Sequence, residues 1–220
     1  MRFFVRVLMA KPFKNLASMT PQDIFSGPSG STPLDEEGKV GLLSHSITTK
    51  SELNEAEQAN ILMATIWVDH SRIQEKQLLS IKRLKLLHRR MFNQVWKWAG
   101  QFRKSDTNIG VPWWDISVQL DSLCNDTLTQ IADNSSPRWT NDEIVTRFHH
   151  RLVQIHPFVN GNGRHARLVT NKLLNILGEE DFTWGSSSID QEGSVRRNYI
   201  QALRKADNHD FTALLRFARS

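Results

Sequence analysis

The chain has 220 residues, of which 39% are hydrophobic, enough to bury one good core in a single domain. Its 28 basic and 23 acidic residues give a net charge of +5, which suits a nucleotide or an acidic partner. No run of five or more basic residues occurs, so the charge pattern gives no sign of a nucleic-acid-binding tail or a direct nucleic-acid partner.

The N-terminal part is expected to differ in order from the rest. Residues 26–33 are rich in Gly, Pro and Ser, so residues 1–35 are predicted to form a poorly ordered extension, with Met19 a possible natural start. Residues 36–220 are predicted to form one domain with its core at 80–218. The apolar stretch at residues 3–10 contains Arg6, is too short to span a membrane and lacks a clear signal-peptide layout, so no membrane partner is expected.

The first half of that domain reads as two helices. The pattern Thr49-x-x-Glu52 is a capping box that opens a helix to about residue 69. Its inward face is predicted to hold Leu53, Ala56, Met63 and Trp67. A second helix is predicted over residues 78–98, where Gly100 ends it. Its apolar stripe, at spacings of three and four, holds Ile81, Leu84, His88, Met91 and Val95.

The second half contains the only plausible strands and then more helices. Residues 101–114 are predicted to form a hairpin-like flap around residues 108–110, followed by a helix marked by Leu120, Leu123 and Ile131. Thr140-x-x-Glu143 caps the next helix, which ends at His156, and residues 164–177 form another, closed by Gly178. Helices around Tyr199 and after Asp210 complete an all-α bundle of about seven helices with a short β-hairpin flap.

The single cysteine limits the redox chemistry. Cys124 excludes an internal disulfide and is typical of a reducing, cytoplasmic compartment. It shares an apolar helical pattern with Leu120 and Leu128, so a buried thiol is predicted rather than a nucleophile.

Residues 156–167, His-Pro-Phe-Val-Asn-Gly-Asn-Gly-Arg-His-Ala-Arg, form the most informative stretch of the chain. The glycines let backbone N–H groups approach an anion, and the helix that follows offers its N-terminus to phosphate. Arg164 and Arg167 lie three residues apart and reach the same first turn. His156 titrates near neutral pH and can take a proton from a hydroxyl. A base beside a polyphosphate site points to nucleotidyl or phosphoryl transfer.

Other interpretations of this stretch fit less well. Residues 161–166 match G-x-G-x-x-G/A, but a helical pattern precedes them where a dinucleotide site needs a strand. No Walker A loop occurs, and no histidine of this region has a second one four residues on, as a helical metal site would require. A helix–turn–helix whose glycines only turn the chain leaves His156, Asn162, Arg164 and Arg167 unexplained.

At these residues the chain closely resembles the Fic (Fido) family, whose signature is H-P-F-x-(D/E)-G-N-G-R-x-x-R. Every specified position matches except the fifth, which is Asn160. The resemblance extends over residues 87–103 before the flap and residues 199–210 in the closing helices, and covers roughly residues 50–218. Residues 32–35 and 52–55 look most like the Fic subgroup called mobile mystery protein B.

The resemblance implies a bacterial protein adenylyltransferase that transfers AMP from ATP, with Mg²⁺, to a hydroxyl side chain of a target protein. His156 would be the catalytic base, and Phe158 would plug the core. The implied nucleotide-binding set is Gly161, Asn162, Gly163, Arg164, Arg167, Tyr199 and Asp207. The implied target-binding flap, which would pair with an extended target segment, is Asn108, Ile109, Gly110 and Val111. His165 would face away as a surface residue.

Asn160 departs from the family pattern, in which an acid binds Mg²⁺. An amide carbonyl is a weaker ligand than a carboxylate, so Asn160 is expected to bind the metal weakly. The departure leaves open transfer of another nucleotide or of phosphate, although the family's phosphate-transferring Doc branch carries Lys where this chain has Gly163. A catalytically weak Fic-fold module that binds a nucleotide or a protein is also open.

The resemblance also raises the question of inhibition. Many Fic proteins are held inactive by a glutamate in (S/T)-x-x-x-E-(G/N) that pairs with the second motif arginine, here Arg167. Glu192 fits the pattern but lies between core helices, and Glu55 lacks the final Gly or Asn. We therefore expect a separate inhibitory antitoxin, with this chain as the toxin-like member of the pair.

Overall fold

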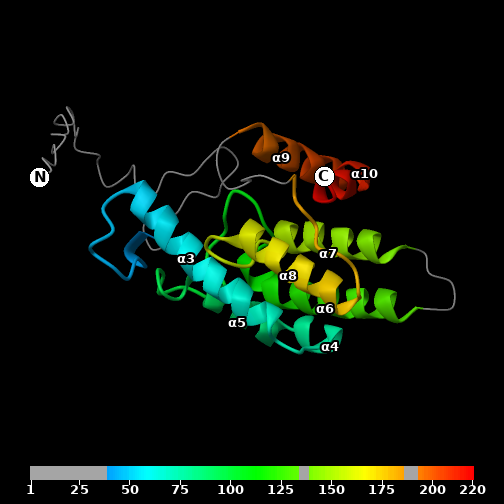
Figure 1. Cartoon of the computed structure of the whole chain (residues 1–220), viewed down its shortest axis with the longest axis horizontal. Coiled ribbons are helices and arrows are strands. Elements are labelled where there is room, and N and C mark those ends of the chain that lie inside the picture. Colours follow the sequence, from blue (N-terminus) through cyan, green and yellow to red (C-terminus); the bar gives the residue numbers. More distant parts are fainter. Residues whose placement is uncertain (1–38, 134–138, 186–192) are drawn as a thin grey trace, which may run out of the picture.

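The computed structural model describes residues 39–133, 139–185 and 193–220, and within them the protein is helical (Figure 1). The helices are α3 (Lys50–Asp69), α4 (Glu75–Leu78), α5 (Ile81–Phe92), the 3-10 turn η1 (Trp113–Asp115), α6 (Ile116–Ala132), α7 (Asn141–Ile155), α8 (Asn162–Ile176), α9 (Ser194–Asp207) and α10 (Thr212–Ala218). The expected all-α class is confirmed. The expected N-terminal extension, including Met19, lies outside the described residues, as does Glu192.

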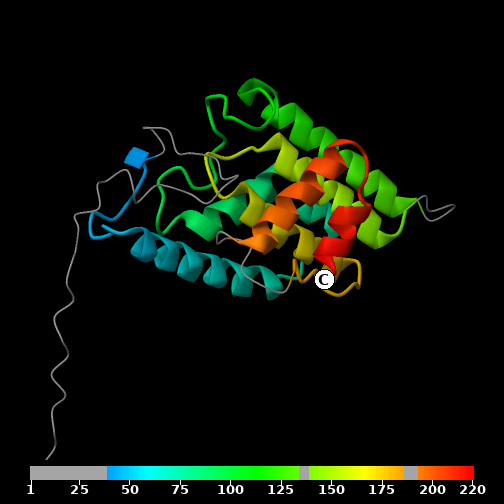
Figure 2. The ribbon, with the colours of Figure 1, turned by 90° about the horizontal axis from the view of Figure 1, so that it is seen from above.

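Helices α7 and α8 form the centre of the bundle. Helix α8 packs against α7 and α5, α6 covers another side of α7, and α3 packs on α5. Helices α9 and α10 pack on each other and cross over the central pair, with α3 and α6 along opposite edges (Figure 2). Side chains such as Phe148, Leu152, Val169 and Leu173 are fully buried where α7 and α8 meet. The loop that joins these two central helices contains residues 156–161, so the core fixes both of its ends.

Local sequence signals set the helix starts. At the starts of α3 and α7, Thr49 and Thr140 accept hydrogen bonds from the backbone N–H groups of Glu52 and Glu143, whose carboxylates bond back to the caps. Both predicted capping boxes are therefore confirmed. Cys124 is buried in α6, so the predicted buried thiol is also confirmed, and burial raises the pKa of this thiol to about 12.

The predicted helix over residues 78–98 is wrong in its extent. Helix α5 ends at Phe92. Just after it, the backbone N–H of Gln94 donates a hydrogen bond to Oδ1 of Asn60 in α3 at 2.9 Å. The chain then turns, and Trp96 pairs with Leu42 in an isolated bridge. Val95 and Trp96 remain buried, so the apolar spacing continues past the point where the helix stops.

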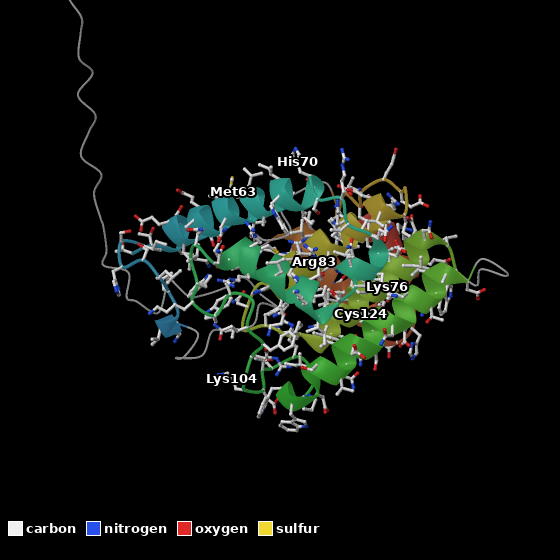
Figure 3. The ribbon with its side chains drawn as sticks, turned by 90° about the horizontal axis from the view of Figure 1, so that it is seen from below. Met63, His70, Lys76, Arg83, Lys104 and Cys124 are labelled. Carbon is white, nitrogen blue, oxygen red and sulfur yellow. The ribbon has the colours of Figure 1, made fainter. Side chains whose placement is uncertain are left out.

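The predicted inward face of α3 is wrong at Met63, whose side chain is 64% exposed. The buried stripe of α3 holds Leu53, Glu57, Asn60, Ala64 and Val68. Because two of these residues are polar, hydrophobicity alone does not locate the stripe. Figure 3 shows Met63 and His70 along the outer edge of α3.

The predicted hairpin is absent: in the described part of the chain, residues 101–114 contain no strand, and Phe102 forms an isolated bridge with Phe158. The flap, residues 105–112, is held in another way. The guanidinium of Arg103 bonds to the carbonyls of Ser105 and Val111, and the N–H of Val111 donates to Ile155. Backbone groups that would pair the two arms of a hairpin are thereby used elsewhere. No helix within the described residues is long and apolar enough to cross a membrane.

Candidate active site

His156 ends α7 in a left-handed conformation, with φ of 54°. Proline follows it and cannot continue the helix, so the chain turns sharply at this residue. The imidazole Nδ1 lies 3.4 Å from the carbonyl of Val153. A carbonyl only accepts, so Nδ1 carries the hydrogen and Nε2 keeps the lone pair that a base needs. Burial lowers the pKa of His156 to about 4. The bond to Val153 opposes this shift, and the nearby charge of Arg103 adds to it. The imidazole is therefore neutral at pH 7.

The loop after His156 is anchored by Phe158, which is fully buried as predicted. The ring of His88 stacks on it, with ring centroids 3.7 Å apart. The N–H of Gly100 donates to Nδ1 of His88, so the opposite nitrogen, Nε2, donates to the carbonyl of Asn160 at 3.0 Å. Burial lowers the pKa of His88 well below its usual value and keeps this ring neutral. His88 thus holds the loop at its middle, a role that its place in an apolar stripe did not reveal.

Asn162 fastens the same loop from inside. Its Oδ1 accepts from the N–H of Phe158 at 2.9 Å, and its Nδ2 donates to the carbonyl of Phe158 at 2.8 Å. The side chain is buried, and both of its polar ends are used within the loop. The resemblance places Asn162 in the nucleotide-binding set, and here its side chain bonds within the loop while its backbone N–H lies at the start of α8.

The two glycines of the loop have different surroundings. Gly161 has φ of 76°, and a Cβ there would lie 2.4 Å from the ring of Phe92, so no other residue fits without a shift. A Cβ on Gly163 would have one neighbour within 4 Å, at 3.9 Å. Helix α8 starts here with no side-chain cap and no acid in its first turn. Its first N–H groups lack partners within the helix, and with the positive end of the helix dipole they suit an anion.

The two arginines of the motif leave α8 toward different neighbours. Arg164 donates to Glu57 of α3 at 2.6 Å and lies over the ring of Phe92. The other carboxylate oxygen of Glu57 accepts from the indole of Trp96, so Arg164 is held by a buried, shared carboxylate. Arg167 lies with its guanidinium carbon 6.0 Å from the ring of Tyr199. A glutamate of α3 thus meets the first motif arginine, while Glu55 is exposed and bonds to Ser51.

The expectation for His165 is wrong. Its side chain is fully buried, and its Nε2 donates to the carbonyl of Leu84 at 2.9 Å. Its ring also packs edge-on against Phe158. Because α8 is covered by both α7 and α5, it has little outward face in this turn. Burial lowers the pKa of His165 to about 4.

Two residues of the expected nucleotide set lie on α9. Tyr199 is buried on α9, and its hydroxyl is 2.9 Å from Nε2 of His149 in the core. Asp207 lies two helical turns further along α9 and bonds to His150 of α7 at 2.8 Å. Tyr199 also lies near a motif residue, Arg167.

The flap reaches the base through its glycine. Asn108 and Ile109 are exposed, Gly110 has φ of 120°, and a Cβ there would lie 3.0 Å from the Cβ of His156. Val111 is bonded to the last residue of α7. The structure therefore brings the flap against His156, without paired strands.

The position expected for the metal offers few ligands among the described residues. The side-chain oxygen of Asn160 accepts from the N–H of Gly161 at 2.6 Å. The described residues contain no group of three His, Cys, Asp or Glu that could hold an ion. An amide oxygen already engaged by the backbone does not make a magnesium site by itself.

Comparisons with known proteins agree with this geometry. The model of the Fic/DOC family matches residues 78–174, which include α5, the flap and the whole motif loop. Over 224 residues the chain is 24% identical to a protein of Nematostella vectensis named protein adenylyltransferase Fic, covering 88% of this chain and 50% of that protein. A protein of the same name from Drosophila erecta is 28% identical over 167 residues, 70% of this chain and 30% of its own length. The chain thus spans half or less of these curated relatives.

Solved structures share the fold. Fic-1 from C. elegans superposes with a TM-score of 0.60 at 23% identity, over 76% of this chain and 48% of that one. The BepC protein of Bartonella tribocorum, solved with bound AMPPNP, gives a TM-score of 0.61 at 17% identity, over 80% of this chain and 89% of that one. With its motif loop between the two central helices, the segment of residues 78–174 belongs to the Fic/DOC family.

Proposed function

We propose that this protein is a protein adenylyltransferase that transfers AMP from ATP to a hydroxyl side chain of a target protein. The observation that carries the proposal is the placement of His156 at the end of α7, directly before the uncapped N-terminus of α8. A base for a hydroxyl and a cradle for phosphate thus lie on one short loop, in a chain whose curated relatives are named adenylyltransferases.

The residues assign the steps of the reaction. Nε2 of His156 takes the proton of a target Ser, Thr or Tyr hydroxyl, and the oxygen attacks the α-phosphorus of ATP. The bond to the β-phosphate breaks, AMP stays on the target and pyrophosphate leaves. Backbone N–H groups at the start of α8 stabilise the charge that develops on the phosphate oxygens. Arg164 and Arg167 hold the β- and γ-phosphates through charge-assisted bonds.

Magnesium enters the proposal through the nucleotide. When bound, Mg²⁺ neutralises charge on the phosphates. Asn160 offers an amide oxygen in place of a carboxylate, so we assign most of the metal coordination to the phosphates themselves.

The target segment is proposed to lie against residues 108–111, which cover His156 from outside. The exposed side chains of Asn108 and Ile109 and the glycine between them and Val111 leave this edge open to an extended polypeptide. We keep Tyr199, which lies beside Arg167, and Asp207 in the proposed nucleotide-binding set on α9.

A separate inhibitory protein remains part of the proposal, with this chain as its toxin-like partner. Glu57 offers an internal alternative to such an inhibitor, because its carboxylate pairs with Arg164, which we assign to the phosphates. If the protein alone is inert and Glu57→Ala activates it, a separate inhibitor is not needed. If Glu57→Ala stays as inert or as active as the wild type, restraint from α3 is ruled out.

The decisive experiment incubates the purified protein with lysate and each α-labelled nucleoside triphosphate, then identifies the labelled proteins by mass. We expect label from ATP that is lost in His156→Ala, because a general base contributes about 10²- to 10⁴-fold in rate. His45→Ala, an exposed histidine before α3, is the matched control and should label normally. Labelling by His156→Ala at the wild-type rate refutes the base. Label from another nucleotide, or nucleotide binding without transfer, refutes the adenylyltransferase and supports another transferase or a binding module.

A further inference from the structure

Arg103 is a buried arginine outside the motif loop, with a side chain that is only 1% exposed. Its guanidinium donates to four backbone carbonyls, those of His156 (2.7 Å), Ser105 (2.9 Å), Val111 and Ile155 (3.4 Å). Its own N–H donates to the carbonyl of Pro157 at 3.0 Å. The nearest carboxylate, Asp106, is 3.7 Å away and mostly exposed. A buried cation usually pairs with an acid, whereas this one is satisfied mainly by carbonyls of the flap and of the base.

These carbonyls belong to three pieces of chain that must be placed relative to one another. Ser105 and Val111 lie on the two arms of the flap, on either side of residues 108–110. Ile155 and His156 are the last turn of α7, where carbonyls have no partner within the helix and a cation opposes the helix dipole. One planar side chain with five donors in a fixed arrangement joins all of them.

Gly110 gives a second, independent sign that the flap and the base are fitted to each other. A Cβ added at this residue would lie 2.6 Å from Nη2 of Arg103 and 3.0 Å from the Cβ of His156. The flap therefore packs directly on the base and on the guanidinium beneath it. A shift of the flap moves both.

We propose that Arg103 is a positioning residue, which holds the flap and the left-handed turn of His156 as one unit and so aims the imidazole at the target hydroxyl. This inference rests on the proposed transfer reaction for its catalytic meaning. The guanidinium of Arg103 bonds to backbone carbonyls, so we assign it no contact with nucleotide or hydroxyl. It acts through His156, and it makes the surface that receives the target and the base that activates it move together.

A purely structural arginine would behave differently. It would lower the folded fraction and leave the properties of each folded molecule unchanged. Arg219 offers that comparison, because it also donates to backbone carbonyls, those of Glu180 and Asp181. It pairs with Asp142 in the first turn of α7, at the end of that helix opposite to His156.

The test compares Arg103→Lys, Arg103→Met and Gly110→Ala with Arg219→Lys in the full chain. We expect kcat for AMP transfer to fall 10- to 100-fold in the first three, since misplacement of about 1 Å costs on the order of 10²-fold, with KM for ATP within about threefold of wild type. Arg103→Lys should keep more activity than Arg103→Met. Arg219→Lys should keep the wild-type kcat per folded molecule. Gly110→Ala keeps the arginine, so it decides the matter if the arginine variants fold poorly.

Imidazole ¹⁵N resonances of His156, recorded without nucleotide, separate this inference from the proposed function. They should shift in Arg103→Lys and Gly110→Ala and stay in place in Arg219→Lys. If the wild type transfers no AMP, the adenylyltransferase proposal fails, yet shifted resonances still show that Arg103 positions His156. Unchanged resonances, or a wild-type kcat in Arg103→Met and Gly110→Ala, overturn the positioning role.

Discussion

Asn162→Ala separates two roles for the most buried amide of the loop. In the structure the side chain clasps the N–H and the carbonyl of Phe158. Alanine removes both bonds and leaves those two backbone groups without their partners in a region closed to water. The alternative role, contact with phosphate, would leave the loop intact when the amide is removed.

The expected cost follows from the two abandoned groups. Each buried, unsatisfied donor or acceptor costs about 1–3 kcal/mol, so the free energy of unfolding should fall by about 2–6 kcal/mol. For a chain of this size each kcal/mol lowers Tm by about 2–4 °C, so a decrease of at least about 4 °C is expected. Asn125→Ala is the control, because that amide is exposed and has a single bond, to Asp121.

Calorimetric melting and ATP titration, both on the purified variants, read the two roles separately. We expect the Tm to fall in Asn162→Ala and to stay at the wild-type value in Asn125→Ala. The folded Asn162→Ala protein should also transfer less AMP, because the loop that carries the base is loosened. If Asn162→Ala melts with the wild type while its affinity for ATP falls, the clasp is unimportant and the phosphate role is correct.

Four further outcomes are expected. The acidic limb of the pH profile of kcat/KM should lie near pH 4, because burial lowers the pKa of His156 to about 4. The base then stays neutral from pH 7 down to that value, and the rate falls only below it. A limb near pH 6.5 contradicts this burial. Asn160→Asp should lower the Mg²⁺ concentration for half-maximal rate, and an unchanged or raised requirement argues against a metal role. Arg167→Lys should reduce transfer while much ATP binding survives, because lysine keeps the charge but loses the planar fork; a lower Tm with unchanged transfer per folded molecule means a structural role only. Glu57→Ala should lower Tm by several degrees, since it strands a buried indole and a guanidinium, whereas the exposed Glu55→Ala should melt with the wild type; equal melting of both variants contradicts a stabilising pair.

What the sequence could predict depended on signals that are local. The capping boxes at Thr49 and Thr140 and the helix that follows the loop are visible in short patterns, and the structure confirms them. The loop itself, with Phe158 at its centre, was found because its residue types occur together in one stretch.

What the sequence could not predict depends on partners far along the chain. His88 and Asn160 are 72 residues apart, and Glu57 and Arg164 are 107 apart, so no local spacing connects them. The predicted hairpin fails only in part for this reason: the N–H of Val111 donates to the distant Ile155, whereas carbonyls of both arms accept from Arg103, which is close to them in the sequence. The outward position of His165 was implied by the family resemblance, which does not show that α8 is covered on two sides here.

The ion pair of Arg164 has a consequence for where the working unit begins. The family match starts at residue 78, yet the carboxylate that holds this arginine comes from α3, which ends at Asp69. Leu53 and Ala64 of the same helix also close the apolar cluster of Phe92, Trp96 and Trp98. A fragment that starts at the boundary of the match would keep every motif residue but would lose Glu57, the carboxylate that pairs with Arg164. For any shortened or grafted version of this domain, the first residue to retain therefore lies before Thr49, where the cap of α3 begins.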